Sequence, residues 1–373
     1  MGDSKTRVEW YKASDLPVEV VEQWHKLYNS CISPNVYLSP DFVQAALRTF
    51  YDSDVLVACI RSINGLQAFA LVEDGAPSFR FPLRSLKLVK TKHSFRSGLL
   101  LSSDIEDSSL DAFVAGLLKR APCLQFSDFC LDTAVARKLS ESANRLNLSW
   151  YENRRYDRAF LRTNMSLDEW EATIRKKKLK EMGRTQSRLK EQGDLSWRVV
   201  NGKDVDDKVI DSFLELEHKG WKGESGNSIL SDAKEAEFFR RVVRNFKTRD
   251  KVFFTEVVLD DAVVASMCNF KSRDQAFAFK VAWEPALARY SPGIMNEVAF
   301  IRYLTEHDVS FDLIDSGAGP DSYINSLWPD RAPMFHGYLL RGRHAKILAW
   351  ALTKSRRVKH FVSRSIGREA RAA

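Results

Sequence analysis

The sequence predicts an α/β protein, in the looser α+β sense, with two tandem domains, each a mixed and mostly antiparallel sheet flanked by helices. Three observations predict this class. The 373 residues suffice for two domains of roughly 100 to 200 residues. Their composition, 44% hydrophobic and 28% charged, is typical of a globular chain. Strand and helix periodicities follow one order in both halves, and Val55-Leu56-Val57 aligns with Val252-Phe253-Phe254 without a gap.

The first half follows the order β-α-α-β-β-β-α-β and adds a helix and a strand. Asn64-Gly65 separates two β-rich runs, which is typical of a hairpin turn. The predicted elements are 8–11, 18–28, 41–51, 55–61, 66–72, 79–89, 109–119, 124–129, 134–146 and 148–151.

The second half repeats this order, with Asp260-Asp261 at its hairpin turn and a short helix near Tyr323. Its predicted elements are 195–200, 205–221, 233–247, 252–259, 262–270, 276–283, 293–306, 311–315 and 334–340. A long polar helix, or a pair of helices, is predicted between the halves. We therefore expect domains at 1–165 and 194–341, a basic helical connector at 166–193 and a basic amphipathic tail at 342–373.

The formal net charge of +8 is concentrated in two segments. Residues 175–190 hold eight Lys or Arg against one acid, and residues 341–373 hold ten against one. The first segment is either a solvated connector or a surface that contacts phosphate groups. The tail either docks its apolar stripe on the protein body or lies on an anionic membrane surface. No aromatic and basic recognition motif accompanies these charges, so we expect no specific nucleic-acid binding.

The N-terminus lacks an apolar run behind a basic start, and no apolar stretch approaches 18 residues. These features predict a cytoplasmic protein, with the tail offering peripheral contact at the inner membrane face. The five cysteines form no Cys-x-x-Cys pair and lie near no clustered histidines, so we expect reduced thiols and no metal site.

The loop that joins the strand 276–283 to the helix 293–306 has the features of an anion site. Ser291 is a favoured N-cap residue, Pro292 suits the first helical position, and Gly293 allows close approach of a ligand to the backbone. The amides of Gly293, Ile294 and Met295, together with the helix dipole, should attract an anion. The alternative is an ordinary helix start after a turn.

Arg289 precedes this helix and could offer its guanidinium to the same anion, such as a pyrophosphate. The first half has no equivalent loop, since its nearest counterpart, Arg96-Ser97-Gly98, lacks a Ser-Pro cap. The second half is therefore expected to carry the ligand.

The strand Phe277–Trp283, followed by Glu284-Pro285 and Ala288-Arg289-Tyr290-Ser291-Pro292-Gly293, resembles the CelD/BcsL-type acyltransferases of the GNAT superfamily. Further matches occur across 167–340 and are the basic run 176–188, Phe213-Leu214-x-Leu216-x4-Trp221, and Phe311-Asp312-Leu313-Ile314-Asp315 with Gly319 and Tyr323.

The resemblance implies two GNAT-like domains akin to the Fem-type transferases, the first degenerate and the second binding acetyl-CoA or another acyl-CoA through Arg289, Tyr290, Ser291, Gly293 and Ile294. It also implies a bacterial protein associated with exopolysaccharide or cellulose biosynthesis. One departure is that Tyr323 is followed by Ile324 and Asn325 rather than by the lysine usual in the family.

Acyl transfer needs a neutral nucleophile, a stabilised oxyanion and a proton for the departing thiolate. No Ser-His-Asp or Cys-His arrangement is evident, so direct transfer to an amine or hydroxyl is expected. The resemblance implies that Tyr323 protonates the thiolate, the alternative being packing beneath the loop. Asp315, at the carboxyl end of its strand, is either a base that orients the acceptor or a turn residue.

Five further residues are candidates for substrate binding. Lys280 interrupts an apolar strand and is expected near the acceptor. Glu217, His218 and Trp221 end the first helix of the second half, where Trp221 either stacks on a sugar or packs in the core. Glu256 is either an acid-base group or a partner in a salt bridge.

These expectations together describe an acyltransferase whose acceptor is unknown and is expected to be anionic or lipid-linked. Two alternatives remain. One is a Fem-like transferase that depends on aminoacyl-tRNA, and the other is a non-catalytic assembly protein with the same fold.

Overall fold

The computed structural model describes residues 7–51, 55–77, 81–309, 311–343, 345, 347 and 351. The predicted amphipathic tail at 342–373 therefore lies almost wholly outside the described residues. Within them, no helix combines the length and apolar character needed to cross a bilayer.

The first half forms the elements that its periodicity predicts, with the 79–89 strand shortened, the 148–151 strand lengthened and a short strand, β5, that was not predicted. They are β1 (Glu9–Lys12), α1 (Val18–Ser30), α2 (Pro40–Phe50), β2 (Leu56–Ser62), β3 (Gly65–Gly75), β4 (Ser85–Leu88), β5 (Leu100–Leu101), α3 (Asp107–Arg120), β6 (Cys123–Cys130), α4 (Ala134–Arg145) and β7 (Ser149–Arg162).

The second half repeats the order after a connector of two helices. Its elements are α5 (Leu167–Thr173), α6 (Lys176–Lys190), β8 (Leu195–Asn201), α7 (Asp207–His218), α8 (Trp221–Glu224), α9 (Ala233–Lys247), β9 (Val252–Leu259), β10 (Ala262–Ser272), β11 (Gln275–Trp283), the 3-10 turn η5 (Pro285–Tyr290), α10 (Pro292–Glu306), β12 (Leu313–Asp315), η6 (Tyr323–Ser326) and β13 (Asp330–Leu340).

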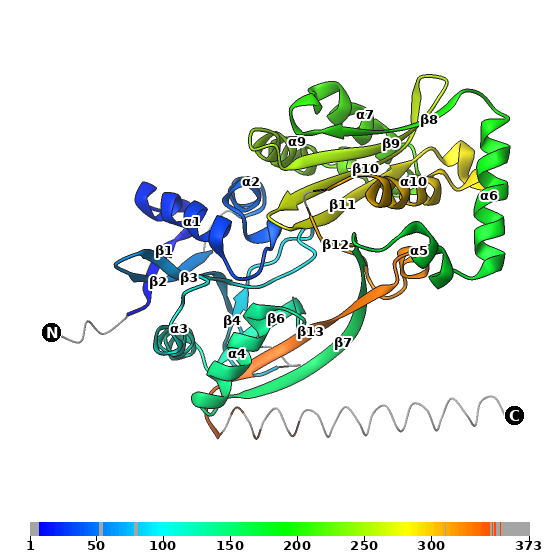
Figure 1. Ribbon diagram of the computed structural model, residues 1–373. Helices are drawn as coiled ribbons and strands as arrows, with labels where there is room; N and C mark the ends of the chain where they lie inside the picture. Colours follow the sequence, from blue (N-terminus) through cyan, green and yellow to red (C-terminus); the bar gives the residue numbers. More distant parts are fainter. Residues whose placement is uncertain are drawn as a thin grey trace, which may run out of the picture.

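The two halves share one continuous sheet among the described residues, with the strand order β1-β2-β3-β4-β6-β13-β7-β12-β11-β10-β9-β8 (Figure 1). Each half contributes one parallel pair, β4 with β6 and β11 with β12. The final strands are exchanged, because β7 pairs with β12 of the second half and β13 pairs with β6 of the first. β7 and β13 also pair with each other along their length, which joins the halves at the centre of the sheet.

β7 is the element that the sequence predicts least well. The prediction ends at residue 151, whereas the strand continues to Arg162. Residues 152–162 carry many charges, and a charged run of this kind is typical of an exposed loop when its neighbours in the fold are unknown. The central position between β13 and β12 satisfies the backbone, and Arg158 is buried through ion pairs described below.

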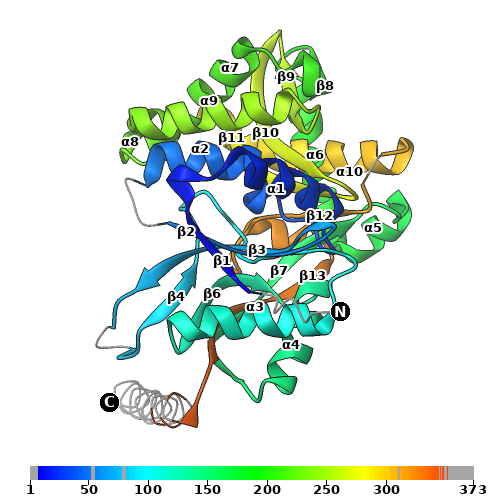
Figure 2. The same cartoon turned by 90° about the vertical axis from the view of Figure 1, so that its left-hand side faces the viewer.

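Packing between the halves extends beyond the sheet. Helix α2 of the first half lies beside α9 of the second (Figure 2). Phe42 of α2 meets Phe238 of α9 edge-on, with ring centroids 5.5 Å apart, and also lies 6.1 Å from the ring of Phe279 on β11. Burying a phenylalanine contributes about 1.5 to 3 kcal/mol, so these rings stabilise the contact between the halves.

The parallel pair β11 and β12 separates soon after it forms. Gln275, Ala276 and Phe277 pair with Leu313, Ile314 and Asp315, after which the chain leaves β12 as a loop. β11 continues for six more residues, to Trp283. The strands therefore diverge toward η5 and the start of α10.

Candidate active site

A narrow slot occupies the place where β11 and β12 diverge. It has a volume of about 180 Å³. Its walls come from residues 278–281 of β11, from Ser316, Gly317 and Ala318 after β12, from Glu297 of α10, and from Tyr323 and Trp328 around η6. Phe95 of the first half closes one side, so the β11–β12 slot is built by both halves.

The start of α10 differs in detail from the sequence prediction. Ser291 has a left-handed backbone, with φ 53° and ψ 54°, and its side chain makes no capping hydrogen bond. The amide of Met295 donates to the carbonyl oxygen of Ser291 at 3.1 Å, as the first bond of the helix, so this amide is already used. The amides of Gly293 and Ile294 have no partner within the helix because they belong to its first turn.

A larger basic cleft of about 860 Å³ opens at the same helix start. It is lined by Ser291 and Ile294, by α6 and by the segment that follows η6. Its cationic side chains are Arg175, Lys177, Lys178 and Arg331. Helix α6, predicted to be either a solvated connector or a phosphate-contacting surface, thus places part of its charge beside the first turn of α10 (Figure 1). A helix N-terminus beside several cations favours an anionic ligand.

Two of these cations are held by hydrogen bonds to the segment at and after η6. Lys178 donates to the hydroxyl oxygen of Ser326, and burial lowers the pKa of Lys178. Arg331 donates to the carbonyl oxygen of Trp328 at 2.5 Å and to that of Asn325. These hydrogen bonds hold the segment at and after η6 in place as one wall of the cleft.

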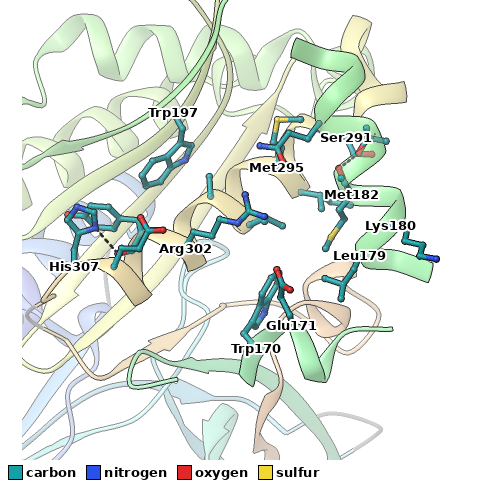
Figure 3. Close-up of a pocket in the computed structure, with 18 residues that line it drawn as sticks. Trp170, Glu171, Leu179, Lys180, Met182, Trp197, Ser291, Met295, Arg302 and His307 are labelled. Atoms are coloured by element: carbon teal, nitrogen blue, oxygen red, sulfur yellow. Dashed lines mark hydrogen bonds between the residues drawn. The ribbon is translucent and has the colours of Figure 1, made fainter. Parts of the chain in front are cut away.

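A third hollow, the α6 trough, lies between α6 and α10 and has a volume of about 540 Å³. Figure 3 shows the side chain of Arg302 extending into this gap, with Trp170 and Trp197 on opposite sides. The trough shares Ser291 and Ile294 with the basic cleft. Helix α6 therefore covers the start of α10 with a hollow on each side.

Tyr323 lines the slot, as its predicted role requires. The residue is 43% exposed. Desolvation of the hydroxyl, and after it the nearby Glu297 carboxyl, raise the pKa of Tyr323 above its ordinary value.

Glu297 is the slot residue that sequence reasoning missed. It is 4% exposed, and its Oε2 atom has no hydrogen-bond partner. Burial raises the pKa of this carboxyl to about 8, and the neighbouring Trp328 offsets the effect only in part. The available signal was an acid on the buried face of α10, in line with the buried Gly293 and Ile301.

Asp315 lies at the end of β12 as predicted, yet it does not line the slot. It is 2% exposed and lies 3.6 Å from Arg158 and 3.8 Å from Arg96. Its Oδ1 accepts a hydrogen bond from the amide of Gly317 at 2.9 Å. A carboxylate between two guanidinium groups acts as their counter-ion, and the Gly317 contact shows the predicted turn role.

Arg158 connects the two halves through this cluster. It donates to the carbonyl oxygen of Ala318 at 3.1 Å and to the hydroxyl of Tyr156 at 2.8 Å. It also lies 3.8 Å from Asp128 of the first half. The loop that forms one wall of the slot is therefore held by a buried cation from β7.

Lys280 lines the slot, where the sequence placed it near an acceptor. Its ammonium group lies 5.3 Å from the ring centroid of Phe95 and 5.4 Å from that of Phe279. Cation-π contacts of this kind satisfy a partly buried charge.

Arg289 and Tyr290 lie close to the cleft in the chain but outside its lining. Arg289 is exposed, and its guanidinium lies 4.7 Å from the ring centroid of Tyr290. Tyr290 is buried in an apolar cluster that contains Leu189 and Met295. Gly293 is buried, and a Cβ atom there would approach the Trp283 ring at 3.3 Å.

Three other predicted residues, Glu217, His218 and Glu256, lie outside the slot and the basic cleft. Glu217 accepts a hydrogen bond from the amide of Ile229 at 2.8 Å, and His218 pairs with the hydroxyl of Ser228 at 2.7 Å. Trp221 begins α8, but its side chain lies outside the described part of the chain. Glu256 is buried and forms a 2.8 Å ion pair with Arg198, the salt bridge that was the alternative for this residue.

Comparison with known proteins finds a family similarity in the second half. Residues 176–323 match the model of the acetyltransferase (GNAT) domain family. The match includes α6, the start of α10 and Tyr323, and thus most of the residues that line the slot and part of the basic cleft. No curated protein matches the sequence.

Solved structures support the fold over nearly the whole chain. The crystal structure of FemX is 9% identical, covers 89% of this chain and 96% of its own, and has a TM-score of 0.56. A protein of unknown function from Bacteroides thetaiotaomicron is 10% identical, with coverages of 88% and 98% and a TM-score of 0.56. The C-terminal domain of a proposed lysylphosphatidylglycerol synthetase from Agrobacterium fabrum is 13% identical, with coverages of 90% and 96% and a TM-score of 0.52. The predicted fold class, tandem GNAT-like units of mixed sheet and helix, is confirmed.

Proposed function

We propose that this protein is an acyltransferase that moves an acetyl or other acyl group from an acyl-CoA to an amine or hydroxyl of an acceptor. The observation that carries the proposal is the basic cleft at the first turn of α10, which adjoins the β11–β12 slot through the shared Trp328. The GNAT domain match over the same residues supports it.

The cleft and the slot suit different parts of the donor. The amide of Ile294, with Lys177 and Lys178, would hold the diphosphate, because charged donors and a helix start together favour phosphate oxygens. Gly293, which the sequence also offered for this role, is buried and does not line the cleft. The slot is narrow and mostly apolar, apart from Lys280, Glu297 and Tyr323. A pantetheine arm that enters it would bring its thioester beside these side chains.

The proposed reaction is direct transfer. The neutral acceptor attacks the thioester carbonyl, an oxyanion forms, and the carbon–sulfur bond breaks with a proton delivered to sulfur. The residues of the slot exclude water and orient the thioester, which accounts for much of the expected rate enhancement. Asp315 holds the loop through Arg96 and Arg158 instead of taking a proton from the acceptor.

Calorimetry with acetyl-CoA tests the donor site. Replacing both cleft lysines (Lys177→Ala with Lys178→Ala) should weaken binding by roughly 10- to 100-fold, since hydrogen bonds to charged groups contribute about 1.5 to 3 kcal/mol. The matched control is Lys176→Ala with Arg184→Ala, which removes two charges from α6 outside the cleft. Absence of acetyl-CoA binding by the wild-type protein would refute the donor assignment.

The acceptor is proposed from the resemblance to CelD/BcsL-type enzymes and from the charge of the protein. An anionic or lipid-linked acceptor, such as a component of exopolysaccharide or cellulose biosynthesis, would suit the cationic surroundings of the cleft. Contact with the membrane face through the segment 342–373 belongs to the same proposal, as does the assignment of donor binding to the domain at 194–341.

A second candidate function rests on the outer side of α6. Lys176, Lys180, Arg184 and Arg188 are exposed and spaced four residues apart, so they form one stripe along the helix. Such a stripe would suit a polyanion, including the aminoacyl-tRNA of a Fem-like transferase. Filter binding of aminoacyl-tRNA, with a strong dependence on salt and no affinity for acetyl-CoA, would favour this function over the first.

A further inference from the structure

Three titratable side chains line the β11–β12 slot, namely Lys280, Glu297 and Tyr323. The family resemblance implies that Tyr323 is the proton donor. The structure offers a second acid in the same slot, and the surroundings of the two acids differ.

Glu297 occupies a position on α10 that packing would reserve for an apolar side chain. It is 4% exposed and lies one turn after Gly293 and one turn before Ile301, on the buried face of the helix. A buried carboxyl without a full set of hydrogen bonds costs stability. Its Oε2 atom lacks such a bond, and so does the indole Nε1 atom of the neighbouring Trp328, which is the group that partly offsets the raised pKa of the carboxyl. Both residues line the slot, so a ligand there could supply the missing partners.

The groups packed around Glu297 leave it without a cationic partner that would hold it ionised. β10 presents Met267 to the slot, the loop after β12 presents Ser316, and η6 presents Tyr323. β11 presents Lys280, whose ammonium group lies over the rings of Phe95 and Phe279. The cations of α6 line the cleft and the trough instead. Burial therefore decides the charge of Glu297, and its pKa of about 8 keeps it neutral at pH 7.

Tyr323 is a weaker acid here than a free tyrosine, because its surroundings and the Glu297 carboxyl raise its pKa. A proton donor works best when its pKa lies near the working pH. The Glu297 carboxyl has a pKa of about 8 and meets this condition, whereas the raised pKa of Tyr323 lies further from the working pH than that of a free tyrosine.

We infer that Glu297, and not Tyr323, is the catalytic acid that protonates the departing thiolate sulfur of the acyl donor. This inference rests on the proposed function and names the residue that completes it. Tyr323 then acts as a positioning residue at the mouth of the slot.

Glu297 gives up one proton and regains one proton in each turnover. The acceptor nitrogen bonds to the thioester carbon, and the carbon–sulfur bond breaks as sulfur takes the proton of the Glu297 carboxyl. The resulting carboxylate removes the extra proton from the newly acylated nitrogen, directly or through water. Thioester and amine thus become thiol and amide, and Glu297 ends in its starting form.

The test compares Glu297→Gln with Tyr323→Phe and with Glu237→Gln, an exposed acid on α9 whose ion pair with Arg241 lies on the surface. Calorimetry first measures acetyl-CoA binding by each full-length protein. Release of CoA thiol from acetyl-CoA is then followed with hydroxylamine as a small nucleophile, as a function of pH.

We expect Glu297→Gln to bind acetyl-CoA like the wild type and to lower kcat about 10²- to 10⁴-fold, the usual contribution of a general acid. The wild-type rate should fall as the pH rises through about 8, because the carboxyl loses its proton, and this decline should be absent in the variant. Tyr323→Phe should raise KM more than it lowers kcat. Equal rates and equal pH profiles for wild type and Glu297→Gln, with normal binding, would overturn the inference and leave the proposed function intact.

A second measurement needs no acceptor. The thiol of bound CoA can be titrated by the ultraviolet absorbance of its thiolate. An ionised carboxylate next to the sulfur disfavours the thiolate, so the bound thiol should titrate at a higher pH in the wild type than in Glu297→Gln. Identical titrations would show that Glu297 is not adjacent to sulfur. Failure of the wild type to bind CoA at all would instead count against the proposed function.

Discussion

The helices α3 and α10 occupy equivalent places in the two repeats, but their first turns carry opposite electrostatic character. α3 begins with Glu106 and Asp107, and the carboxylate of Asp107 forms ion pairs with Lys138 and Arg145, each at 3.1 Å. α10 begins without an acid, and its first turn lies beside the lysines of the basic cleft. A shared backbone order therefore does not give both halves a ligand site, because the residues at one helix start decide it.

The loops that precede these helices differ as well. In the second half η5 leads directly into α10, next to the cleft. In the first half the loop between β4 and α3 crosses toward the second half, where Phe95 lines the slot and Arg96 lies 3.8 Å from Asp315. The first half thus acts as a wall of the site in the second half.

The largest expected effect comes from breaking the link between the halves. Arg158→Ala leaves Asp315 and Asp128 without their shared buried cation, and loss of one partner of a buried ion pair costs about 3 to 5 kcal/mol. Denaturant unfolding should show this loss. Arg155→Ala, on the same strand, removes an exposed pair with Glu152 and should cost less than about 1 kcal/mol. Equal losses in the two variants would mean that Arg158 does not join the halves.

The contacts that link the two halves could not be predicted from the sequence. Local signals gave the helix and strand order because capping, hairpin turns and periodicity act over a few residues, as at Asp260-Asp261, whose positive φ angles of 48° and 64° suit a tight hairpin. The exchange of β7 and β13, and the pairing of Arg158 with Asp315, depend on contacts between distant segments. No local pattern encodes such contacts.

The candidate site was predictable to the same extent. The helix start at Ser291-Pro292-Gly293 and the slot residue Lys280 each interrupt a local pattern, so the sequence alone points to them. Tyr323, which also lines the slot, was predicted from the family resemblance. Arg289 was predicted in the site from its spacing and from the family resemblance, whereas its guanidinium lies over the ring of Tyr290 and outside the lining of the cleft. Glu297 was missed because its significance comes from burial, which only the packed structure shows.

The second prediction concerns the pH dependence of stability. It tests whether α10 carries a buried neutral carboxyl at Glu297 close to the basic cleft at its start. Because the folded state raises the pKa of Glu297 from an ordinary value near 4.5 to about 8, the unfolded state ionises first. Stability should therefore fall as the pH rises through this window, by about 1.4 kcal/mol for each pH unit. Glu297→Gln lacks the group and should gain stability relative to the wild type between pH 5 and pH 8. Parallel denaturant midpoints for the two proteins across that range would contradict a buried neutral carboxyl.

The smallest effect is expected when α10 is given the acidic start of α3. Ile294→Glu places a carboxylate in the first turn of α10, at the mouth of both hollows. Repulsion of phosphate should weaken acetyl-CoA binding by roughly tenfold at low salt and by less at high salt. Ile294→Gln is the matched neutral control, measured by the same calorimetry. Similar acetyl-CoA affinities for the two variants would mean that the start of α10 does not bind the phosphate groups of the donor.

The most direct test of the account is a crystal structure of the protein with bound CoA. The account predicts diphosphate density at the amide of Ile294, beside Lys178, with the thiol end of the molecule in the β11–β12 slot. Density at the start of α3, or CoA bound elsewhere while the cleft beside α10 stays empty, would contradict it.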